Sequence, residues 1–490
     1  MVMDKEGVSS LEWRINLPNG TSETLVPRSG SICRMWLGLK CHVEGILLKA
    51  RRFLEKAWKL AVDEPSKVIH CVKVGVALSL VSLFYYMRPL YDGFGGNALW
   101  AVMTVVVVFE YSVGATLSKS VNRATATFIA GLLGVGVHWL ATQSGEKLEP
   151  IILGFSVFLF ASAATFSRFI PSVKARFDYG AMIFILTFSF VSVSGYRIDR
   201  LFELSYQRFF TIAIGTSLCI MISIIIFPIW AGSDLHNLIY HNLEKLSDSL
   251  QGSVAEYFRD DGTESKEDCD SKVQGYKCVL NSKATEESMA NFASWEPPHG
   301  RFNFGHPWKQ YLKIGEAIRS CACCIETLNS FVYSEVEAPA HLKEHLKHLC
   351  MTLSSTSSNV LNELAVTLKS MKKSLKIDFL VEEMNFAVQE LQKTLKTLPN
   401  HHIMRPPLTT QTTDDAPSGG PITEPIVPTL IEILPLATLV SLLIENAARI
   451  EGIADAVDEL AGLAEFQPAI DKKTNQSQQA KNPSADNQDH

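Results

Sequence analysis

Residues 68–87, VIHCVKVGVALSLVSLFYYM, form an apolar stretch long enough to cross a lipid bilayer as one helix. A single cation, Lys73, lies within its first third, too deep for its ammonium group to reach the headgroups easily. A cation at that depth costs at least about 2.5 kcal/mol on insertion scales, so it is usually kept for a reason. Two reasons are open: an ion pair, for instance with Glu110, or a cationic position on a path for anions. We favour the path, because this one acid faces several bases.

Five further apolar stretches follow, and each predicts a membrane helix: 98–109, 124–141, 151–166, 179–194 and 209–230. The first of these five is short for a span of about 20 residues, so we expect it to continue through residues 112–116 or to be partly covered by protein. Three glycines of the next stretch, Gly131, Gly134 and Gly136, predict close helix packing. We therefore predict an all-α integral membrane protein with six transmembrane helices per subunit, followed by a cytosolic helical domain.

The composition divides the chain into four parts. Residues 1–66 are predicted to be a cytosolic N-terminal segment, loose up to residue 45 and ending in a basic amphipathic helix over 46–66. Residues 67–231 hold the six-helix transmembrane pore domain. After them, apolar residues recur at helical spacing. This spacing predicts a cytosolic helical domain and a disordered tail, with the following bounds: the domain 232–466, its flexible segments 259–290 and 404–428, and the tail 467–490.

One segment of the second half, residues 426–444, is apolar enough to be weighed as a seventh span. It carries Glu432 and two prolines, Pro428 and Pro435. An unpaired acid is poorly tolerated in a spanning helix, so we expect a buried cytosolic helix here.

Several functional classes lack support in the sequence. A net charge of −6 and the lack of a basic tract with interleaved aromatics argue against nucleic acid as a partner. Cys321, Cys323 and Cys324 lie close together but lack paired C-x-x-C spacing, and we predict neither a metal site nor a cofactor. The sequence contains no phosphate-binding glycine loop, nucleophile elbow or zinc-protease motif, so we predict that the chain is not an enzyme.

Most charges in and beside the membrane stretches are positive. Under the positive-inside rule, the basic cluster at residues 49–59 places the N-terminus in the cytosol, and six spans return the C-terminus to the same side. Many cations converging in one membrane domain also indicate a path for anions. The candidate anion-path residues are Lys73, Lys119, Arg123, Arg168, Lys174, Arg176 and Arg208.

The alternative for several of these cations is a role as anchors at the cytosolic surface. Lys119 and Arg123 are four residues apart, so on a helix they share a face. Asp178 is expected to form an ion pair with one of three nearby bases, Arg168, Lys174 and Arg176.

Several motifs resemble those of one protein family. Residues 91–110, YDGFGGNALWAVMTVVVVFE, with VGATL at 113–117 and FDYG at 177–180, are similar to the plant aluminium-activated malate transporter family. So are two later segments: PIWAG at 228–232, and Trp295, Glu296 and Pro297 followed by HPW at 306–308. The resemblance runs from about Glu64 to Ala464.

The resemblance implies an anion channel of a plant membrane, assembled as a homodimer. Malate and other organic or inorganic anions would pass through a pore lined by basic side chains, with membrane lipid around the helices. We expect the plasma membrane rather than the vacuolar membrane, and a packing corner at Trp295, Glu296 and Pro297. Two alternatives stay open: a proton-coupled organic-anion transporter, with His138 or Glu110 as its proton site, and a membrane-tethered scaffold.

Overall fold

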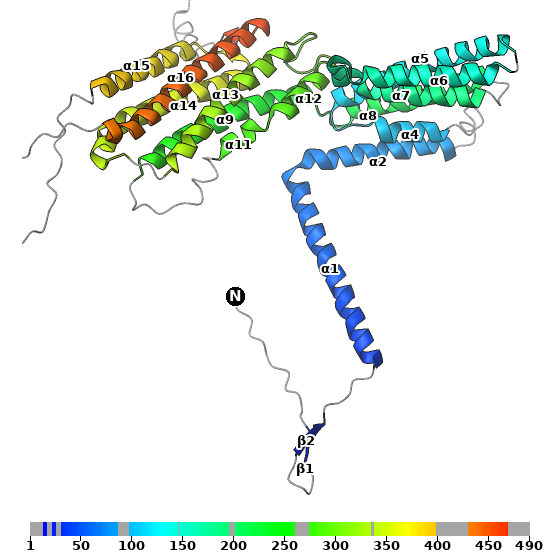
Figure 1. The fold of residues 1–490 in the computed structure, drawn as a ribbon, viewed down its shortest axis with the longest axis horizontal. Coiled ribbons are helices and arrows are strands. Elements are labelled where there is room, and N and C mark those ends of the chain that lie inside the picture. The colour runs from blue at the N-terminus through cyan, green and yellow to red at the C-terminus, as the bar shows by residue number, and fades with distance from the viewer. Residues whose placement is uncertain are drawn as a thin grey trace, which may run out of the picture. The chain divides into compact units, whose positions relative to one another are not determined.

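The chain is almost entirely helical in the computed structural model, which describes residues 13–16, 22–25, 31–86, 98–145, 147–195, 201–259, 274–334, 338–397 and 430–468 (Figure 1). The predicted all-α fold is confirmed. Strands in this described part are limited to two short pairs: β1 (Trp13–Asn16) antiparallel to β2 (Ser22–Leu25), and β3 (Lys372–Lys373) parallel to β4 (Gln467–Pro468). Residues 1–72 and 73–490 form two separate compact units.

The first unit contains β1, β2, the long helix α1 (Ser31–Asp63) and the start of α2 (Pro65–Tyr86). α1 begins well before the predicted residue 46, because Leu39 and Val43 continue the apolar period toward the N-terminus. The expectation of a loose segment up to residue 45 is therefore wrong for this helical part. Pro65 disfavours helical backbone at the residue before it and suits the first turn of α2, so the two helices are separate.

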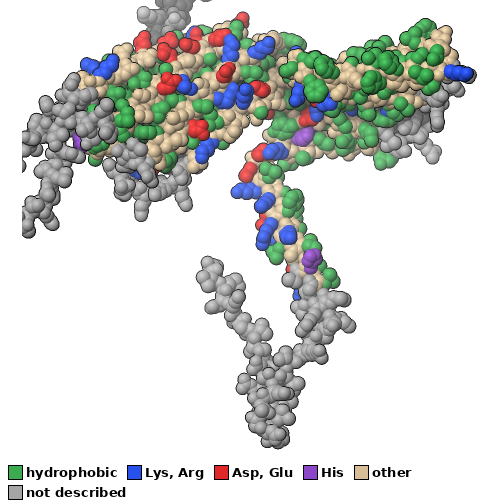
Figure 2. All heavy atoms as spheres, in the orientation of Figure 1, with side chains coloured by type: hydrophobic (Ala, Val, Ile, Leu, Met, Phe, Trp, Pro, Cys, Tyr) green, Lys and Arg blue, Asp and Glu red, His purple; other side chains and the backbone are tan. Residues whose placement is uncertain are grey.

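Six helices carry the predicted membrane stretches: α2, α4 (Ala98–Val108), α5 (Val113–Gln143), α6 (Glu149–Ser167), α7 (Pro171–Gly195) and α8 (Leu201–Ile225). All of them except α4 are long and apolar enough to cross a bilayer. Large side chains such as Phe155 and Phe158 of α6 remain exposed, and Figure 2 shows hydrophobic side chains spread over α5–α7 with few charges among them. An apolar surface spread over several helices is typical of lipid contact, so the chain is an integral membrane protein.

α5 starts before the predicted residue 124. The hydroxyl of Ser112 accepts a hydrogen bond from the amide of Ala115 at 3.2 Å and caps the helix there. Lys119 and Arg123 therefore lie within a membrane helix rather than ahead of one.

α8 ends at Ile225 instead of reaching the predicted residue 230. Phe227 has a positive φ of 41°, which a helix does not contain, and Pro228 follows it. The chain then passes through a short non-helical segment before the next helix begins at Ala231.

α4 is a short helix that its neighbours cover on one side, while Met103 and Val106 on the other side are exposed. Its eleven residues rise about 16 Å, roughly half of a hydrocarbon core of about 30 Å. The non-helical segment 109–112 separates it from α5, so the expected continuation through residues 112–116 is wrong. The other expectation is confirmed, because Val105 and Val108 are buried in one cluster with Ala77 of α2 and Cys219 of α8.

The remaining helices form a bundle around one apolar core: α9 (Ala231–Tyr257), α11 (Gly275–Leu280), α12 (Lys283–Ala293), α13 (Trp308–Val332), α14 (Ala340–Ser370), α15 (Lys376–Thr397) and α16 (Leu430–Leu463). α11 and α12 lie in the second half of the segment 259–290 that was predicted to be flexible. They are ordered because Tyr276 and Val279 of α11 and Ala290 of α12 are buried in the core of the bundle. Residues 260–273, the predicted flexible segment 404–428 and the tail after residue 468 lie outside the described residues.

α16 is a further helix that is long and apolar enough to cross a bilayer. Its side chains Leu436, Leu439 and Leu443 are buried in the same core as those of α13 and α14. Arg449 of α16 donates a hydrogen bond to the carbonyl oxygen of Ser320 in α13 at 2.7 Å. α16 thus packs as a bundle helix, which agrees with the buried helix expected there and not with a seventh span.

One glycine explains how closely α5 approaches α7. A Cβ atom at Gly134 would lie 2.7 Å from Cγ1 of Val191 in α7, whereas a Cβ atom at Gly131 or Gly136 would meet nothing within 4 Å. Of the three glycines predicted to allow close packing, Gly134 is the one that fills this role between α5 and α7.

Replacing this glycine should loosen the membrane helices. We expect Gly134→Ala to destabilise the protein by about 1–3 kcal/mol, because the added methyl group overpacks the contact with Val191. The thermal unfolding midpoint of detergent-solubilised protein measures the change. Gly136→Ala, on the same helix with open space around it, is the matched control; equal midpoints for the two variants would contradict the assigned contact.

Candidate functional site

Arg208 of α8 is a buried guanidinium group surrounded by aromatic rings. The residue is 6% exposed. Its guanidinium carbon lies 3.8 Å from the ring centre of Trp100 in α4 and 3.5 Å from that of Phe190 in α7. Cation–π attraction of this kind partly replaces lost hydration but does not neutralise the charge. Among the described residues, no carboxylate forms an ion pair with Arg208.

Arg123 of α5 is buried to the same extent, at 6% exposed. One of its terminal nitrogens donates a hydrogen bond to the hydroxyl of Tyr179 in α7 at 3.0 Å, and its Nε has no hydrogen-bond partner among the described residues. The charge of Arg123 acts on both Arg208 and Cys219 of α8. α5 and α8 therefore bring two guanidinium groups within electrostatic range of each other.

Lys73 of α2 is 1% exposed, and its ammonium group has no hydrogen-bond partner in the described part of the chain. Ala77 and Val81 follow it by one and two turns on the same face, and both pack in the cluster formed with α4 and α8. Lys73 thus lies on the face of α2 that meets those two helices. The ion pair considered for Lys73 is not formed, because Glu110 pairs with Lys119 instead.

The other candidate cations are paired or exposed. Arg168 forms a two-pronged ion pair with Asp178, with nitrogen–oxygen distances of 2.7 and 3.3 Å, which confirms the partner predicted for Asp178. Lys174 is exposed, and so is Arg176, whose guanidinium lies 5.1 Å from the ring centre of Trp295. Acids therefore neutralise Lys119 and Arg168, and three buried cations without an acid partner among the described residues remain: Lys73, Arg123 and Arg208.

Sequence reasoning did not single out the aromatic groups at this site. The hydroxyl of Tyr179 accepts a hydrogen bond from Arg123, and the centre of its ring lies 5.6 Å from the Lys119 ammonium nitrogen. The rings of Trp100 and Phe190 contact Arg208. Trp100 and Tyr179 belong to the two membrane motifs quoted above, which is the signal that could have pointed to them. Phe190 lies in a plain apolar stretch and carries no such signal.

Glu296 joins the membrane helices to the bundle. Its side chain is 1% exposed. Its carboxylate oxygens accept hydrogen bonds from the amides of Gly114 (3.3 Å), Ala231 (2.6 Å) and Gly232 (3.0 Å). These amides lie in the first turns of α5 and α9, where N–H groups have no partner within the helix and the helix dipole favours negative charge. One carboxylate thus caps two helices. Burial raises the pKa of Glu296, and the three amide donors oppose that rise.

Side chains of the bundle close over this carboxylate. A Cβ atom at Gly232 would collide with the ring of Trp308, and the ring of His299 stacks on Trp230 with centres 3.8 Å apart. Nearby, His236 Nδ1 lies 2.9 Å from the hydroxyl of Tyr311. Burial lowers the pKa of His236 to about 4, so its imidazole is neutral at physiological pH.

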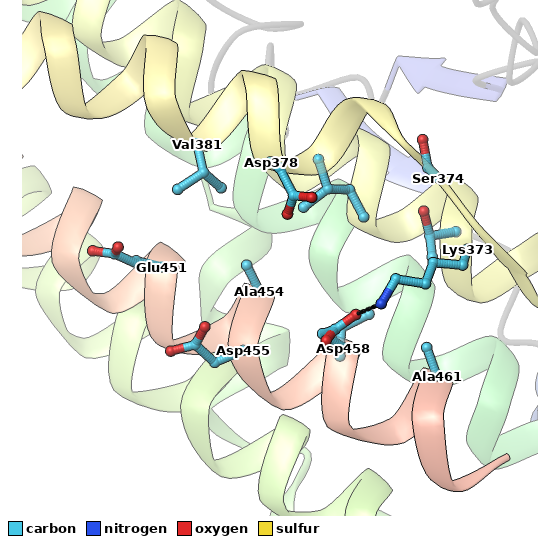
Figure 3. A pocket seen from close by; sticks show the side chains of 12 residues that line it. Lys373, Ser374, Asp378, Val381, Glu451, Ala454, Asp455, Asp458 and Ala461 are labelled. Atoms are coloured by element: carbon cyan, nitrogen blue, oxygen red, sulfur yellow. Dashed lines mark ion pairs between the residues drawn. The ribbon is translucent and has the colours of Figure 1, made fainter. Parts of the chain in front are cut away.

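A cavity of about 240 Å³ in the bundle is lined by charges that are mainly acidic, in contrast to the buried cations of the membrane helices (Figure 3). It lies between α15, α16 and β3, and three aspartates line it: Asp378, Asp455 and Asp458. Lys373 pairs with Asp458 at 2.6 Å. This acidic lining does not suit an anion, so the buried cations of the membrane helices are the stronger candidate site.

Comparison with known proteins finds relatives over most of the chain. The family model described as aluminium activated malate transporter matches residues 58–415. The chain belongs to the aluminium-activated malate transporter family. Aluminum-activated malate transporter 10 of Arabidopsis thaliana is 56% identical over 489 residues, which cover 96% of this chain and 98% of the relative.

More distant members of the aluminium-activated malate transporter family align over similar lengths. Aluminum-activated malate transporter 2 of Arabidopsis thaliana is 43% identical over 454 residues, covering 90% of this chain and 85% of the relative. Aluminum-activated malate transporter 1 of Triticum aestivum is 40% identical over 453 residues, with 91% and 92% covered. The resemblance noted from the motifs is confirmed, and all the candidate cations and Glu296 lie within the matched range.

The shared cap at Glu296 should be sensitive to loss of one oxygen. Glutamine keeps one acceptor but turns an N–H₂ group toward the other amides, so Glu296→Gln should destabilise the protein by about 1.5–3 kcal/mol. Hydrogen exchange should become faster at the amides that then face the N–H₂ group: Gly232 if the carbonyl oxygen replaces Oε1, or Gly114 and Ala231 if it replaces Oε2. Glu316→Gln, at an exposed position of α13, is the control. Unchanged exchange at all three amides would show that Glu296 does not cap these helices.

Acidification should weaken the same region through His236. The imidazole has a pKa of about 4 in the folded protein and about 6.5 in the unfolded chain. The unfolded chain therefore binds more protons between these values, and stability falls as the pH decreases through this window. From pH 7 to pH 5 we expect a loss of about 2 kcal/mol from this group. As the pH is lowered from 7 to 5, the thermal unfolding midpoint should fall less steeply for His236→Gln than for His241→Gln. His241 is an exposed histidine of the same helix and serves as the control. Identical slopes for the two variants would refute the low pKa of His236.

Proposed function

We propose that this protein is an anion channel that passes malate and other organic or inorganic anions through a path lined by basic side chains. The observation that carries the proposal is the set of three buried cations, Lys73, Arg123 and Arg208, with no acid partner among the described residues. Buried charges are normally paired, so unpaired cations at membrane depth favour a mobile anion as the counter-charge. The relatives' names as malate transporters support malate as a substrate.

The path would work through several positions of moderate strength. A malate dianion is strongly hydrated, and a narrow path must replace its water contacts with cationic or N–H donors. Arg123 and Arg208 repel each other, and an anion near both relieves the repulsion. Rings rather than acids hold Arg208, which leaves its charge available to a carboxylate. Such sites bind an anion strongly enough to admit it and weakly enough to release it.

The remaining cations fit supporting roles. Lys119 and Arg168 are neutralised by acids and would act mainly as structural pairs. Lys174 and Arg176 are exposed near the start of α7, where they would raise the local anion concentration at the mouth of the path. We further propose a homodimer in the plasma membrane with both termini in the cytosol. The positive-inside arrangement of the basic residues supports this orientation.

Charge-removing substitutions test which cations matter. We expect Lys73→Gln, Arg123→Gln and Arg208→Gln each to reduce malate current at least about tenfold, which corresponds to about 1.4 kcal/mol of lost stabilisation of the passing anion. Lys174→Gln removes the same charge from an exposed position and should retain most of the current. Surface labelling and size-exclusion elution confirm that each variant is inserted and folded. Normal currents from all three buried-site variants would refute the proposed path.

The reversal potential separates a channel from a coupled transporter. For a channel, it follows the malate gradient and does not move when only the pH gradient changes. A proton-coupled transporter would shift it with pH. Glu110 is a weak candidate for the proton site of such a transporter because it pairs with Lys119. A pH-dependent reversal potential abolished by His138→Gln would favour that alternative.

A further inference from the structure

α1 presents a continuous row of apolar side chains that nothing covers in the described structure. Leu39, Val43, Ile46, Phe53 and Leu60 recur at steps that keep them on one face. All five are largely exposed, and Phe53 reaches 71%. Trp58, at 74%, widens this face. A face of this width exposed to water is unfavourable and marks an interaction surface.

The opposite side of α1 is strongly basic. Between residues 49 and 59 the chain has five basic residues and one acid. That acid, Glu55, pairs with Arg51 at 2.9 Å. Arg52, Lys56 and Lys59 are exposed and form no ion pair with another described residue. The surface that binds α1 must therefore combine apolar contact with negative charge.

The position of α1 in the chain identifies that surface. α1 ends at Asp63, and α2 begins at Pro65 with a segment able to cross a bilayer. The end of α1 must lie at the membrane surface, because a single residue separates it from a spanning helix. A helix that meets the bilayer there with an apolar face and a basic face has the composition of an interfacial helix.

We propose that α1 lies in the surface of the bilayer and binds anionic lipid. Its apolar face, with Phe53 and Trp58, enters the boundary between headgroups and acyl chains. Arg52, Lys56 and Lys59 extend their side chains toward the negatively charged headgroups. This binding surface is separate from the proposed anion path and does not depend on it.

A second copy of the chain is the competing occupant, because Leu39, Val43, Ile46 and Phe53 also fit a coiled-coil spacing. Two observations favour lipid. Pairing two copies of α1 through the apolar face would leave both basic faces pointing away from the contact without a counter-charge, whereas anionic lipid supplies that counter-charge. In addition, Leu47, Leu54 and Trp58 extend the exposed apolar face beyond the narrow seam that a coiled coil buries.

Hydrogen exchange of the full-length protein in nanodiscs tests the proposal. We compare discs of phosphatidylcholine with discs of equal parts phosphatidylcholine and phosphatidylserine. The amides of residues 46–62 should exchange more slowly in the anionic discs. In the triple variant Arg52→Gln, Lys56→Gln, Lys59→Gln, the slowing of exchange caused by anionic lipid should be at least about tenfold smaller. Each basic residue near an anionic surface contributes substantially to binding. The amides of α13 and α14 should exchange at equal rates in both kinds of disc.

Two controls make the result specific. The triple variant Lys309→Gln, Lys393→Gln, Lys396→Gln removes the same charge from exposed positions of the bundle and should keep the lipid-dependent protection. Phe53→Ser should lower protection in both discs, while Phe304→Ser, at a residue 85% exposed, should not. Equal exchange of residues 46–62 in both discs would overturn the proposal. So would protection that ignores lipid charge and accompanies cross-linking between α1 helices of two copies.

Discussion

A single buried carboxylate fixes how the membrane helices meet the rest of the molecule. Glu296 accepts amide protons from the starts of both α5 and α9. The amide of Val113, the first residue of α5, also donates to the carbonyl oxygen of Ile229 at 2.9 Å. The two helix starts are therefore held against each other and against the segment that carries Glu296. Any displacement of the bundle at this point would be felt by α5, the helix that positions Lys119 and Arg123.

The acid and aromatic partners of the basic side chains set the electrostatics of the membrane helices. Glu110 and Asp178 each form an ion pair with one base, so they screen Lys119 and Arg168 and leave the three buried cations without an acid partner among the described residues. Aromatic groups hold two of those buried cations, Arg123 through a phenol hydroxyl and Arg208 through two rings. Aromatic contacts orient a cation without cancelling its charge. The positive potential of the site thus depends on which partner each cation has more than on the number of cations.

The sequence predicted the helices well and their ends less well, for a physical reason. Apolar stretches such as 151–166 can be recognised from local composition alone, and α6 contains the whole of this stretch. Glu296, which holds the starts of α5 and α9 together, is distant in the sequence, so no local pattern could predict this contact. α4 was predicted as a helix, but its partial cover by protein was only one of two alternatives, because that cover comes from α2 and α8. The candidate cations were all visible in the sequence, but the pairing of Glu110 with Lys119 rather than with Lys73 required the folded structure.

The distance along the chain between Gly114 and Glu296 has a consequence for how the protein is made. The two residues are separated by 182 positions, and translation proceeds at about 5–20 residues per second. The start of α5 must therefore wait roughly ten to forty seconds after its synthesis before its capping carboxylate exists. During that interval the membrane helices are inserted but incompletely anchored. Their packing is completed only when α12 and the residues after it, which carry Glu296, contact the starts of α5 and α9.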